Sequence, residues 1–278
     1  MNWKAIGAVS LLTLSVLASS FFFYGQQPTE PKFETMFGAV SSSNLLGCWN
    51  LTTDSTDGSG SGNNGTDTSI SYAASDAAFV RASNSRIVLP NAAAFKATGS
   101  YSVVVWWKTS DGANNPAVFA SYSQNTAVAG FNLYIAGSNK VQWVHGKNTG
   151  VTNNTDYKAL DSATAGSTGS YQMWVFRYTS GGAMEMFLNG NSSADASATP
   201  GFDAAYAATS YPVIGNSSQS GTYINPGNQN IKLVAFFGRA ITTTEMSDLY
   251  ASGAGLPCPY SSGATTYYSP IFFSDDTI

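Results

Sequence analysis

The sequence predicts an all-β protein built as a sandwich of two antiparallel sheets. Short runs with apolar residues at every second position recur along the chain, and segments rich in Gly, Asn and Ser separate them. Aromatic residues make up 13% of the 278 residues and recur at strand spacing, so the chain can fill a core despite its many small polar residues. Only one segment has a convincing helix pattern. One short helix among about a dozen strands is typical of a two-sheet sandwich.

The clearest hairpin occupies the middle of the chain. Residues 171–178 carry apolar side chains on both faces, as expected of a strand whose two faces are both covered by other parts of the protein. Residues 180–182 (Ser-Gly-Gly) provide the positive φ values of a tight reversal, and residues 184–188 resume the alternation. The pair Asn189-Gly190 has the composition of a type I′ turn. We therefore expect this hairpin at the centre of a sheet.

A second inner strand is predicted at residues 101–108, which are also apolar on both faces. We expect Trp106 of this strand and Trp174 of the hairpin to share the interior between the sheets. Two long polar segments, residues 146–170 and 191–209, are predicted as loops because they lack an apolar period. Further strands are predicted at residues 47–51, 78–80, 86–89, 117–122, 130–136, 141–145, 212–215 and 231–238.

The one predicted helix begins at Thr242. Thr242 and Glu245 have the spacing of a capping box, and Met246 and Leu249 begin a short apolar stripe. Gly253 is expected to end the helix.

The N-terminus has a different character. Residues 5–24 are an uncharged run of about twenty residues, which as a helix matches a bilayer core of about 30 Å. A signal peptide cut after Ala18 or Ser20 would expose the aromatic residues that follow, whereas an uncleaved anchor buries them. The sequence favours the anchor, and Lys4, the only charge before the run, favours a domain outside the cytoplasm.

These patterns divide the chain into four parts. Residues 1–25 form a signal-anchor or signal peptide with a hydrophobic helix, residues 26–43 a Pro-containing spacer, residues 44–258 the β-sandwich and residues 259–278 a C-terminal tail.

The low and slightly acidic charge of the chain argues against nucleic acid as a partner. Only 10% of the residues are charged, and the formal net charge is −4 with a pI of about 4.8. No basic surface for nucleic acid is expected.

The two cysteines, Cys48 and Cys258, are assigned to the first and last strands of the domain. They do not form a C-x-x-C pair, so a metal knuckle is not expected. Either they are buried free thiols, or they form a disulfide closing a loop of about 210 residues, for which chain entropy gives roughly 5 kcal/mol.

Four segments, in order, resemble the laminin G-like branch of the concanavalin A-like lectin/glucanase superfamily, a jelly-roll sandwich. They are residues 46–51 followed by the Gly-rich loop 57–66, residues 100–108, residues 174–190 and residues 231–245. The resemblance covers about residues 44 to 253. In that fold the first and last strands lie side by side, which supports a Cys48–Cys258 disulfide.

The resemblance also implies a calcium ion at one sheet edge, because family members often bind Ca²⁺ partly through the first loop. Hard cations need six to eight oxygen ligands. The acidic position of the family's last strand is Lys232 here, and a solvated turn cluster is the alternative reading of this loop. The candidate ligands are Asp54, Asp57, Asn63 and Asp67.

Catalysis is not expected. The glucanase branch uses a Glu-x-Asp-x-x-Glu strand, since retaining hydrolysis needs two carboxyl groups about 5 to 5.5 Å apart. No such cluster occurs among the four glutamates, and His145 is the only histidine, which leaves no evident Ser-His-Asp triad.

Carbohydrate binding remains as a candidate function. Sugar sites combine aromatic faces with amide and carboxylate hydrogen bonds. Sheet packing is the competing explanation for the aromatic candidates. The candidate ligand-binding residues are Tyr134, Trp143, His145, Asp156 and Tyr157. Candidate N-glycosylation sequons begin at Asn50, Asn64, Asn153, Asn191 and Asn216.

We therefore expect a non-catalytic, surface-displayed lectin-like module for carbohydrate recognition or adhesion, anchored in the membrane through residues 5–24 with its domain extracytoplasmic, or secreted if that run is cleaved. The alternative is a structural surface or coat protein, such as a virion component, that uses the jelly roll for packing against neighbouring copies. The apolar tail at residues 265–273 favours this alternative, because it can pack on its own sheet or on a neighbour's exposed edge.

Overall fold

The computed structural model describes residues 40–73, 78–80, 84–90, 93–109, 115–124, 126–219, 222–223 and 228–260. The hydrophobic run 5–24, most of the spacer and the tail after residue 260 lie outside the described residues. Among the residues that are described, no helix has the length and apolar character that crossing a membrane requires.

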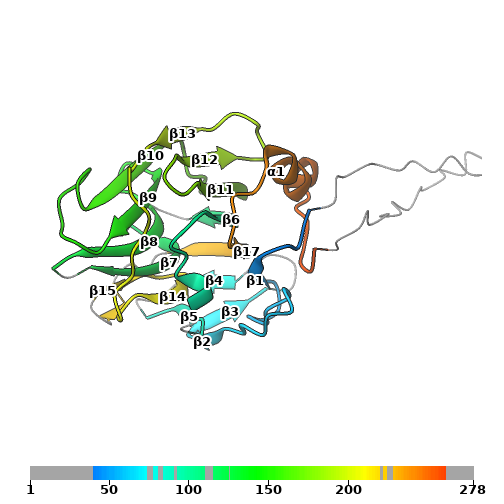
Figure 1. Cartoon of the computed structure of the whole chain (residues 1–278). Helices are drawn as coiled ribbons and strands as arrows, with labels where there is room; N and C mark the ends of the chain where they lie inside the picture. Colours follow the sequence, from blue (N-terminus) through cyan, green and yellow to red (C-terminus); the bar gives the residue numbers. More distant parts are fainter. Residues whose placement is uncertain are drawn as a thin grey trace, which may run out of the picture. The chain divides into compact units, whose positions relative to one another are not determined.

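Two antiparallel sheets form the domain (Figure 1), as predicted. In the first sheet, β1 (Leu45–Asn50) pairs with β17, and the remaining strands run in the order β13 (Ala196–Ala198), β12 (Met184–Leu188), β11 (Gln172–Tyr178), β6 (Tyr101–Thr109), β17 (Gln229–Phe237), β4 (Ala78–Val80) and β3 (Ile70–Tyr72). The second sheet has the order β10 (Tyr157–Ala165), β9 (Lys140–Lys147), β8 (Val128–Ile135), β7 (Ala117–Gln124), β14 (Tyr211–Ile214), β5 (Arg86–Val88) and β2 (Thr66–Thr68). The shorter elements are η1 (Ala93–Phe95), α1 (Thr243–Tyr250), η2 (Ala251–Gly253) and the pair β15 (Ser218–Gln219) and β16 (Thr222–Tyr223).

The central hairpin is confirmed. β11 pairs with β12 on one side and with β6 on the other. Both of its faces are apolar because one lies in the interior between the sheets and the other lies in a second buried cluster on the opposite face of the sheet. Asn189 and Gly190 have φ values of 52° and 71°, as a type I′ turn requires. A Cβ on Gly190 would lie 2.7 Å from the Cβ of Tyr250, so the turn also lets helix α1 approach the hairpin.

The interior between the sheets is strongly aromatic. Trp174 lies there as predicted, but Trp106 does not: Trp107 fills the interior, and Trp106 packs on the opposite face of the same sheet. Neighbouring residues of a strand point to opposite faces, and both faces of β6 are apolar, so alternation alone does not say which tryptophan turns inward.

A second hydrophobic cluster covers that opposite face. It lies beneath α1 and the chain that follows the helix, and Trp106 stacks on Tyr250 with ring centroids 5.8 Å apart. The helix ends at Tyr250, because Ala251 adopts a left-handed conformation with φ of 46°. Gly253, the predicted end, closes the short helix η2 instead.

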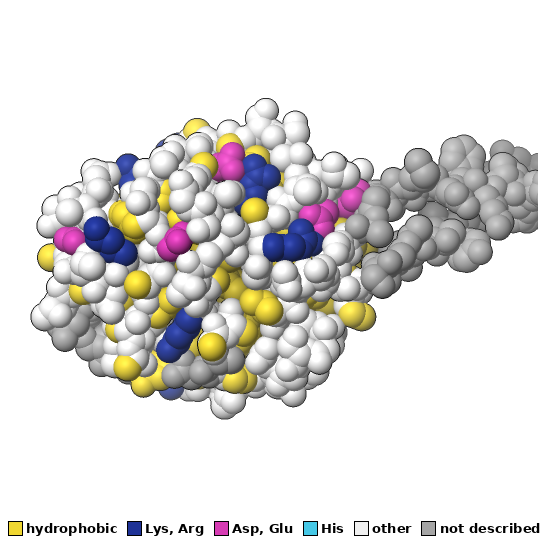
Figure 2. Space-filling model, in the orientation of Figure 1, with side chains coloured by type: hydrophobic (Ala, Val, Ile, Leu, Met, Phe, Trp, Pro, Cys, Tyr) yellow, Lys and Arg dark blue, Asp and Glu magenta, His cyan; other side chains and the backbone are white. Residues whose placement is uncertain are grey.

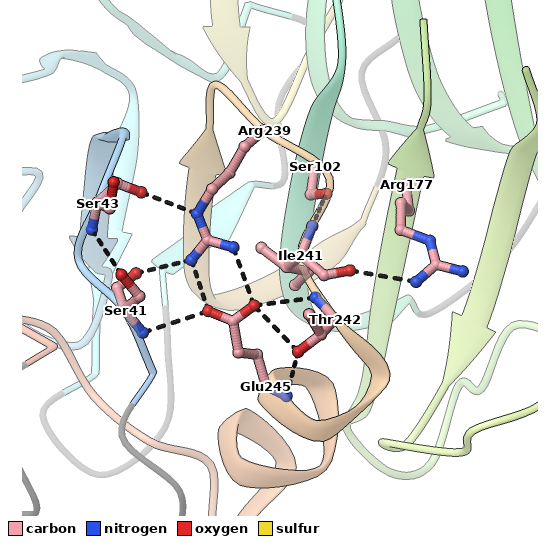
Figure 3. A network of polar contacts seen from close by, with 8 residues as sticks. All are labelled: Ser41, Ser43, Ser102, Arg177, Arg239, Ile241, Thr242 and Glu245. Atoms are coloured by element: carbon pink, nitrogen blue, oxygen red, sulfur yellow. Dashed lines mark hydrogen bonds and ion pairs between the residues drawn. The ribbon is translucent and has the colours of Figure 1, made fainter.

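The helix start is tied to the N-terminal side of the domain (Figure 3). Thr242 and Glu245 form the predicted capping box, and the Glu245 carboxylate also accepts hydrogen bonds from Arg239. Arg239 donates to the carbonyl oxygens of Ser41 and Ser43, and the Ser41 N–H donates to Glu245. The packed structure therefore begins a few residues before the predicted domain start at residue 44.

Two predicted loops contain strands. β10 lies within residues 146–170, and β13 lies within residues 191–209. Both are edge strands, and their side chains are exposed or half-buried apart from the small polar Ser162, so they leave no apolar alternation in the sequence.

The disulfide is present between Cys48 and Cys258, whose Cα atoms are 6.1 Å apart. Cys48 lies on β1, as predicted, and β1 pairs with β17. Cys258 is not on the last strand: it follows α1, in the chain that crosses back over β1.

Few charges mark the surface. On the face drawn in Figure 2, uncharged side chains and backbone dominate, and Lys, Arg, Asp and Glu occur in small separate groups.

Candidate functional site

Four of the five predicted ligand-binding residues lie on strands of the second sheet and separate onto its two faces, and the fifth, Asp156, lies in the turn between β9 and β10. Trp143 and His145 have no exposed surface and lie in the interior, so the prediction that they join Tyr134 on a sugar-binding face is wrong. In the β8–β9 register Tyr134 lies opposite Gln142, one residue away from Trp143. A shift of one residue reverses the face, which is why these aromatics cannot share a surface.

His145 has a packing role. Its Nδ1 lies 3.0 Å from the Tyr101 hydroxyl, and its Nε2 lies 3.3 Å from the Phe202 carbonyl oxygen. Because a carbonyl only accepts, Nε2 carries the proton and Nδ1 accepts from Tyr101. Burial, only partly opposed by the Phe202 hydrogen bond and the Asp203 charge, lowers the pKa of His145 to about 4. The ring is therefore neutral at neutral pH.

The outer face of the same sheet carries a different set of side chains, arranged in rows across β7 to β10. One row holds the two tyrosines Tyr122 and Tyr157, separated by Gly130 and Gly146. Two glycines separate the tyrosine rings, and the Val128 side chain packs over Gly146: a Cβ on Gly146 would lie 2.7 Å from it.

The next two rows complete this face. One is made of small or short side chains, with Asn132 among them: Ala120, Asn132, Val144 and Ala159. The other is polar: Tyr134, Gln142 and Asp161. We call these three rows the tyrosine face.

The tyrosine face has hydrogen-bonding groups of its own. Asn132 is only 3% exposed, and its Oδ1 has no hydrogen-bond partner. Gln142 donates to the Asp161 carboxylate, and the Tyr122 hydroxyl donates to Gln124. Burial, with the nearby Asp161 charge, raises the pKa of Tyr134 to about 12, so its hydroxyl remains a donor at neutral pH. Partly exposed rings beside amide and carboxylate groups can stack on an apolar ring face and bind hydroxyl groups.

Asp156 lies beside this face, in the turn between β9 and β10. Its carboxylate accepts hydrogen bonds from the Thr149 hydroxyl at 2.6 Å and the Thr152 N–H at 3.1 Å. These bonds hold the pKa of Asp156 below its usual value. Asp156 thus shapes the turn that precedes Tyr157.

The predicted calcium loop is organised by Asp57. Its Oδ1 accepts from the N–H groups of Cys48 and Ser59, and its Oδ2 accepts from the Ser59 hydroxyl and the Asn63 N–H. The carboxylate is thereby saturated by donors of the loop and of β1.

The other predicted ligands have separate partners. Asp54 accepts from the Thr56 N–H, Asp67 accepts from the Tyr72 hydroxyl, and the Asn63 side chain donates to the Leu46 carbonyl. No group of three His, Cys, Asp or Glu side chains within the described residues is placed to hold a metal ion. Calcium binding by this loop stays a prediction.

The sequons differ in accessibility. Asn64, Asn153 and Asn191 are exposed. Asn216 is fully buried and its amide donates to the Ser85 carbonyl, so a glycan on it is incompatible with this fold. The Asn50 amide is bound to the main chain of Cys258.

The two antiparallel sheets define a β-sandwich of the jelly-roll kind. The chain belongs to the concanavalin A-like lectin/glucanases superfamily, whose Laminin G model matches residues 81–247. No curated protein matches the chain.

Several solved structures share this fold. The binding domain of Paraclostridial Mosquitocidal Protein 1 is 13% identical, with a TM-score of 0.58 over 75% of this chain and 52% of that one. The binding domain of botulinum neurotoxin DC in complex with SialylT is 12% identical, with a TM-score of 0.54 over 76% of this chain and 52% of that one. Trypanosoma rangeli sialidase in complex with 2,3-difluorosialic acid is 12% identical, with a TM-score of 0.57 over 78% of this chain and 34% of that one. At these identities the likeness shows the fold, and this chain spans about half or less of each structure's length.

Proposed function

We propose that this protein is a non-catalytic carbohydrate-recognition module whose glycan lies on the tyrosine face. Tyr134 and Tyr157 stack on sugar rings, and Gln142, Asp161 and Asn132 bind hydroxyl groups. The observation that carries this proposal is the unpartnered Asn132 Oδ1, buried in a face otherwise bordered by tyrosine rings. A buried acceptor without a partner has a free-energy cost of about 1–3 kcal/mol, which a ligand hydroxyl would remove.

The glutamates support a role without catalysis. Of the two glutamates within the described residues, Glu185 is paired with Arg177 at 2.8 Å and Glu245 is paired with Arg239. Each is used in an ion pair with its own arginine. Glycoside hydrolysis requires two carboxyl groups across one sugar bond.

The comparisons also support glycan binding. The structures that share this fold include binding domains of toxins, one of them in complex with SialylT, and a sialidase in complex with a sialic acid derivative. The family description names lectins as well as glucanases.

Display outside the cytoplasm is part of the proposal. A disulfide is typical of oxidising compartments, and Cys48 is bonded to Cys258. The uncharged run at residues 5–24 would place the domain there, as an anchor or as a cleaved signal.

A glycan array with the full chain tests this function, followed by titration of the best glycan against variants. Tyr134→Ala and Tyr157→Ala are expected to weaken binding about tenfold or more, which corresponds to about 1.4 kcal/mol. Tyr72→Ala is the matched control, because Tyr72 is a half-buried tyrosine on the other sheet. Trp143→Ala is unsuitable, since it opens the core.

Equal loss in the control and in the two tyrosine-face variants, with all three folded, would overturn the placement of the site. Absence of saturable binding to every glycan, or hydrolysis of a glycan by the pure protein, would overturn the function itself.

A further inference from the structure

A cavity lies on the first sheet, away from the tyrosine face. Its volume is about 160 Å³, and its walls include Asn50, Thr52, Trp106, Lys232 and the segment 254–257 that follows the helix. Ala254 and Pro257 are exposed, so the cavity reaches the surface. Drug-sized ligands occupy about 300–1,000 Å³, and this cavity therefore suits a single ring.

Trp106 gives the cavity an aromatic wall with an unused donor. Its side chain is 6% exposed, and Nε1 has no hydrogen-bond partner. Gly255, another wall residue, has a φ of 71°, and a Cβ there would lie 3.0–3.2 Å from the indole ring, nearest its nitrogen-bearing edge. A glycine at this position keeps that edge of the ring free of a side chain. The indole N–H can only donate, so the missing partner is an acceptor oxygen.

Lys232 is the one charged residue among those that line the cavity. Its ammonium lies 5.8 Å from the centre of the Tyr171 ring, and it forms no ion pair with a carboxylate of the described residues. The protein has a net charge of −4, so an anionic ligand is attracted only to places where a cation such as Lys232 lies at the surface. A carboxylate is the anion that completes this site.

The walls are held in place before any ligand arrives. Asn50 bonds both the N–H and the carbonyl of Cys258, directly after the segment 254–257, and the disulfide joins Cys258 to β1. A preformed cavity loses little conformational entropy on binding.

We propose that this cavity binds an acidic monosaccharide, with its ring against Trp106, an oxygen accepting from Nε1–H and its carboxylate beside Lys232. Thr52, with a hydroxyl that both donates and accepts, supplies the polar wall that a sugar needs and an aromatic acid does not. The site uses none of the residues of the tyrosine face, so binding at this cavity can be tested independently of the proposed function.

Titration of the ¹⁵N-labelled full chain with N-acetylneuraminic acid and with glucuronic acid tests the site. The Trp106 indole N–H signal, assigned through Trp106→Phe, is expected to shift and saturate with at least one of the two acids. Methyl glucuronate and glucose are expected to bind at least tenfold more weakly, because they lack the carboxylate.

Lys232→Met removes the charge and keeps the apolar stem, so it should weaken acid binding at least tenfold. Lys96→Met, at a half-buried lysine beside η1, is the matched control and should leave binding unchanged. Tyr134→Ala should also leave it unchanged, which separates this site from the tyrosine face.

Three results would overturn the proposal. They are equal affinity for the acid and its methyl ester, a Trp106 signal unmoved at saturation, and binding of benzoate as tight as that of the acidic sugars.

Discussion

The side-chain amide of Asn50 holds the main chain of Cys258 from both sides. Its Nδ2 donates to the Cys258 carbonyl at 2.8 Å, and its Oδ1 accepts from the Cys258 N–H at 3.1 Å. The Asn50 side chain, on the first strand β1, thus forms the pair of main-chain hydrogen bonds with Cys258 that a neighbouring strand would otherwise form. These bonds place Cys258 next to Cys48, so the chain that closes the cavity beside Trp106 is fixed both covalently and by hydrogen bonds.

Removing the disulfide should lower stability strongly. The Cys48→Ser/Cys258→Ser double variant is expected to lose about 2–5 kcal/mol of unfolding free energy, because its unfolded chain is no longer closed over 210 residues. Urea unfolding of the oxidised wild type and the variant measures the loss. Asn50→Ala in the oxidised chain should lose less. A double variant as stable as the wild type would show that the crosslink contributes nothing.

The single histidine makes stability depend on pH. The pKa of His145 falls from 6.5 to about 4 on folding. Between these two pH values the unfolded chain binds a proton that the folded chain does not bind, so stability is lost as pH falls from about 6.5 towards 4. At about 1.4 kcal/mol per pH unit the loss is about 3 kcal/mol. Unfolding curves between pH 7 and 4 measure it, and His145→Gln should flatten the dependence in that window. An unchanged slope in the variant contradicts this role.

A second acid-dependent contribution is expected at the helix start. Burial opposes ionisation of Glu245, but hydrogen bonds from Arg239 and from the N–H groups of Thr242 and Ser41 lower its pKa from 4.5 to about 2. The resulting stabilisation is present above about pH 4.5 and is lost as pH falls towards 2. Glu245→Gln should therefore be less stable than the wild type at pH 6, with the difference shrinking below pH 4. A constant difference across this range argues against the ion pair as its source.

Gly130 should not tolerate a side chain. Its φ is 76°, and a Cβ there would overlap the Ser121 carbonyl oxygen of the neighbouring strand. Gly130→Ala is expected to lose more than about 1 kcal/mol of unfolding free energy, as measured by thermal or urea unfolding. Gly99→Ala is the matched control, because nothing lies within 4 Å of its Cβ position. Similar stability of the two variants would show that β8 can move to make room.

Removal of a half-buried tyrosine from the tyrosine face should not affect the fold. Tyr134→Ala is expected to change the unfolding free energy by less than about 1 kcal/mol, because Tyr134 is only partly buried on the outer face. Trp143→Ala should lose about 3–5 kcal/mol, since Trp143 fills the interior. Circular dichroism melts of both variants compare them. Equal losses would contradict the assignment of the two side chains to opposite faces.

The sequence alone determined the features that depend on neighbours along the chain. The alternation in residues 171–178 predicted the inner strand β11, Asn189-Gly190 predicted the reversal after β12, and Thr242 with Glu245 predicted the helix start. Each rests on backbone preferences within a few residues, so no distant contact is needed to predict it.

Only the tertiary structure decided which side of each strand faces inward and what the surfaces carry. Trp106 and Trp107 fit their pattern equally well in either orientation, and Trp143 and Tyr134 differ by one position in register. The edge strand β10 and the bond from Asn50 to Cys258 have no local signal, because their partners are far away in sequence. Because a strand is pleated, adjacent side chains point to opposite faces. Which of the two is buried between the sheets depends on where the second sheet and the C-terminal chain pack.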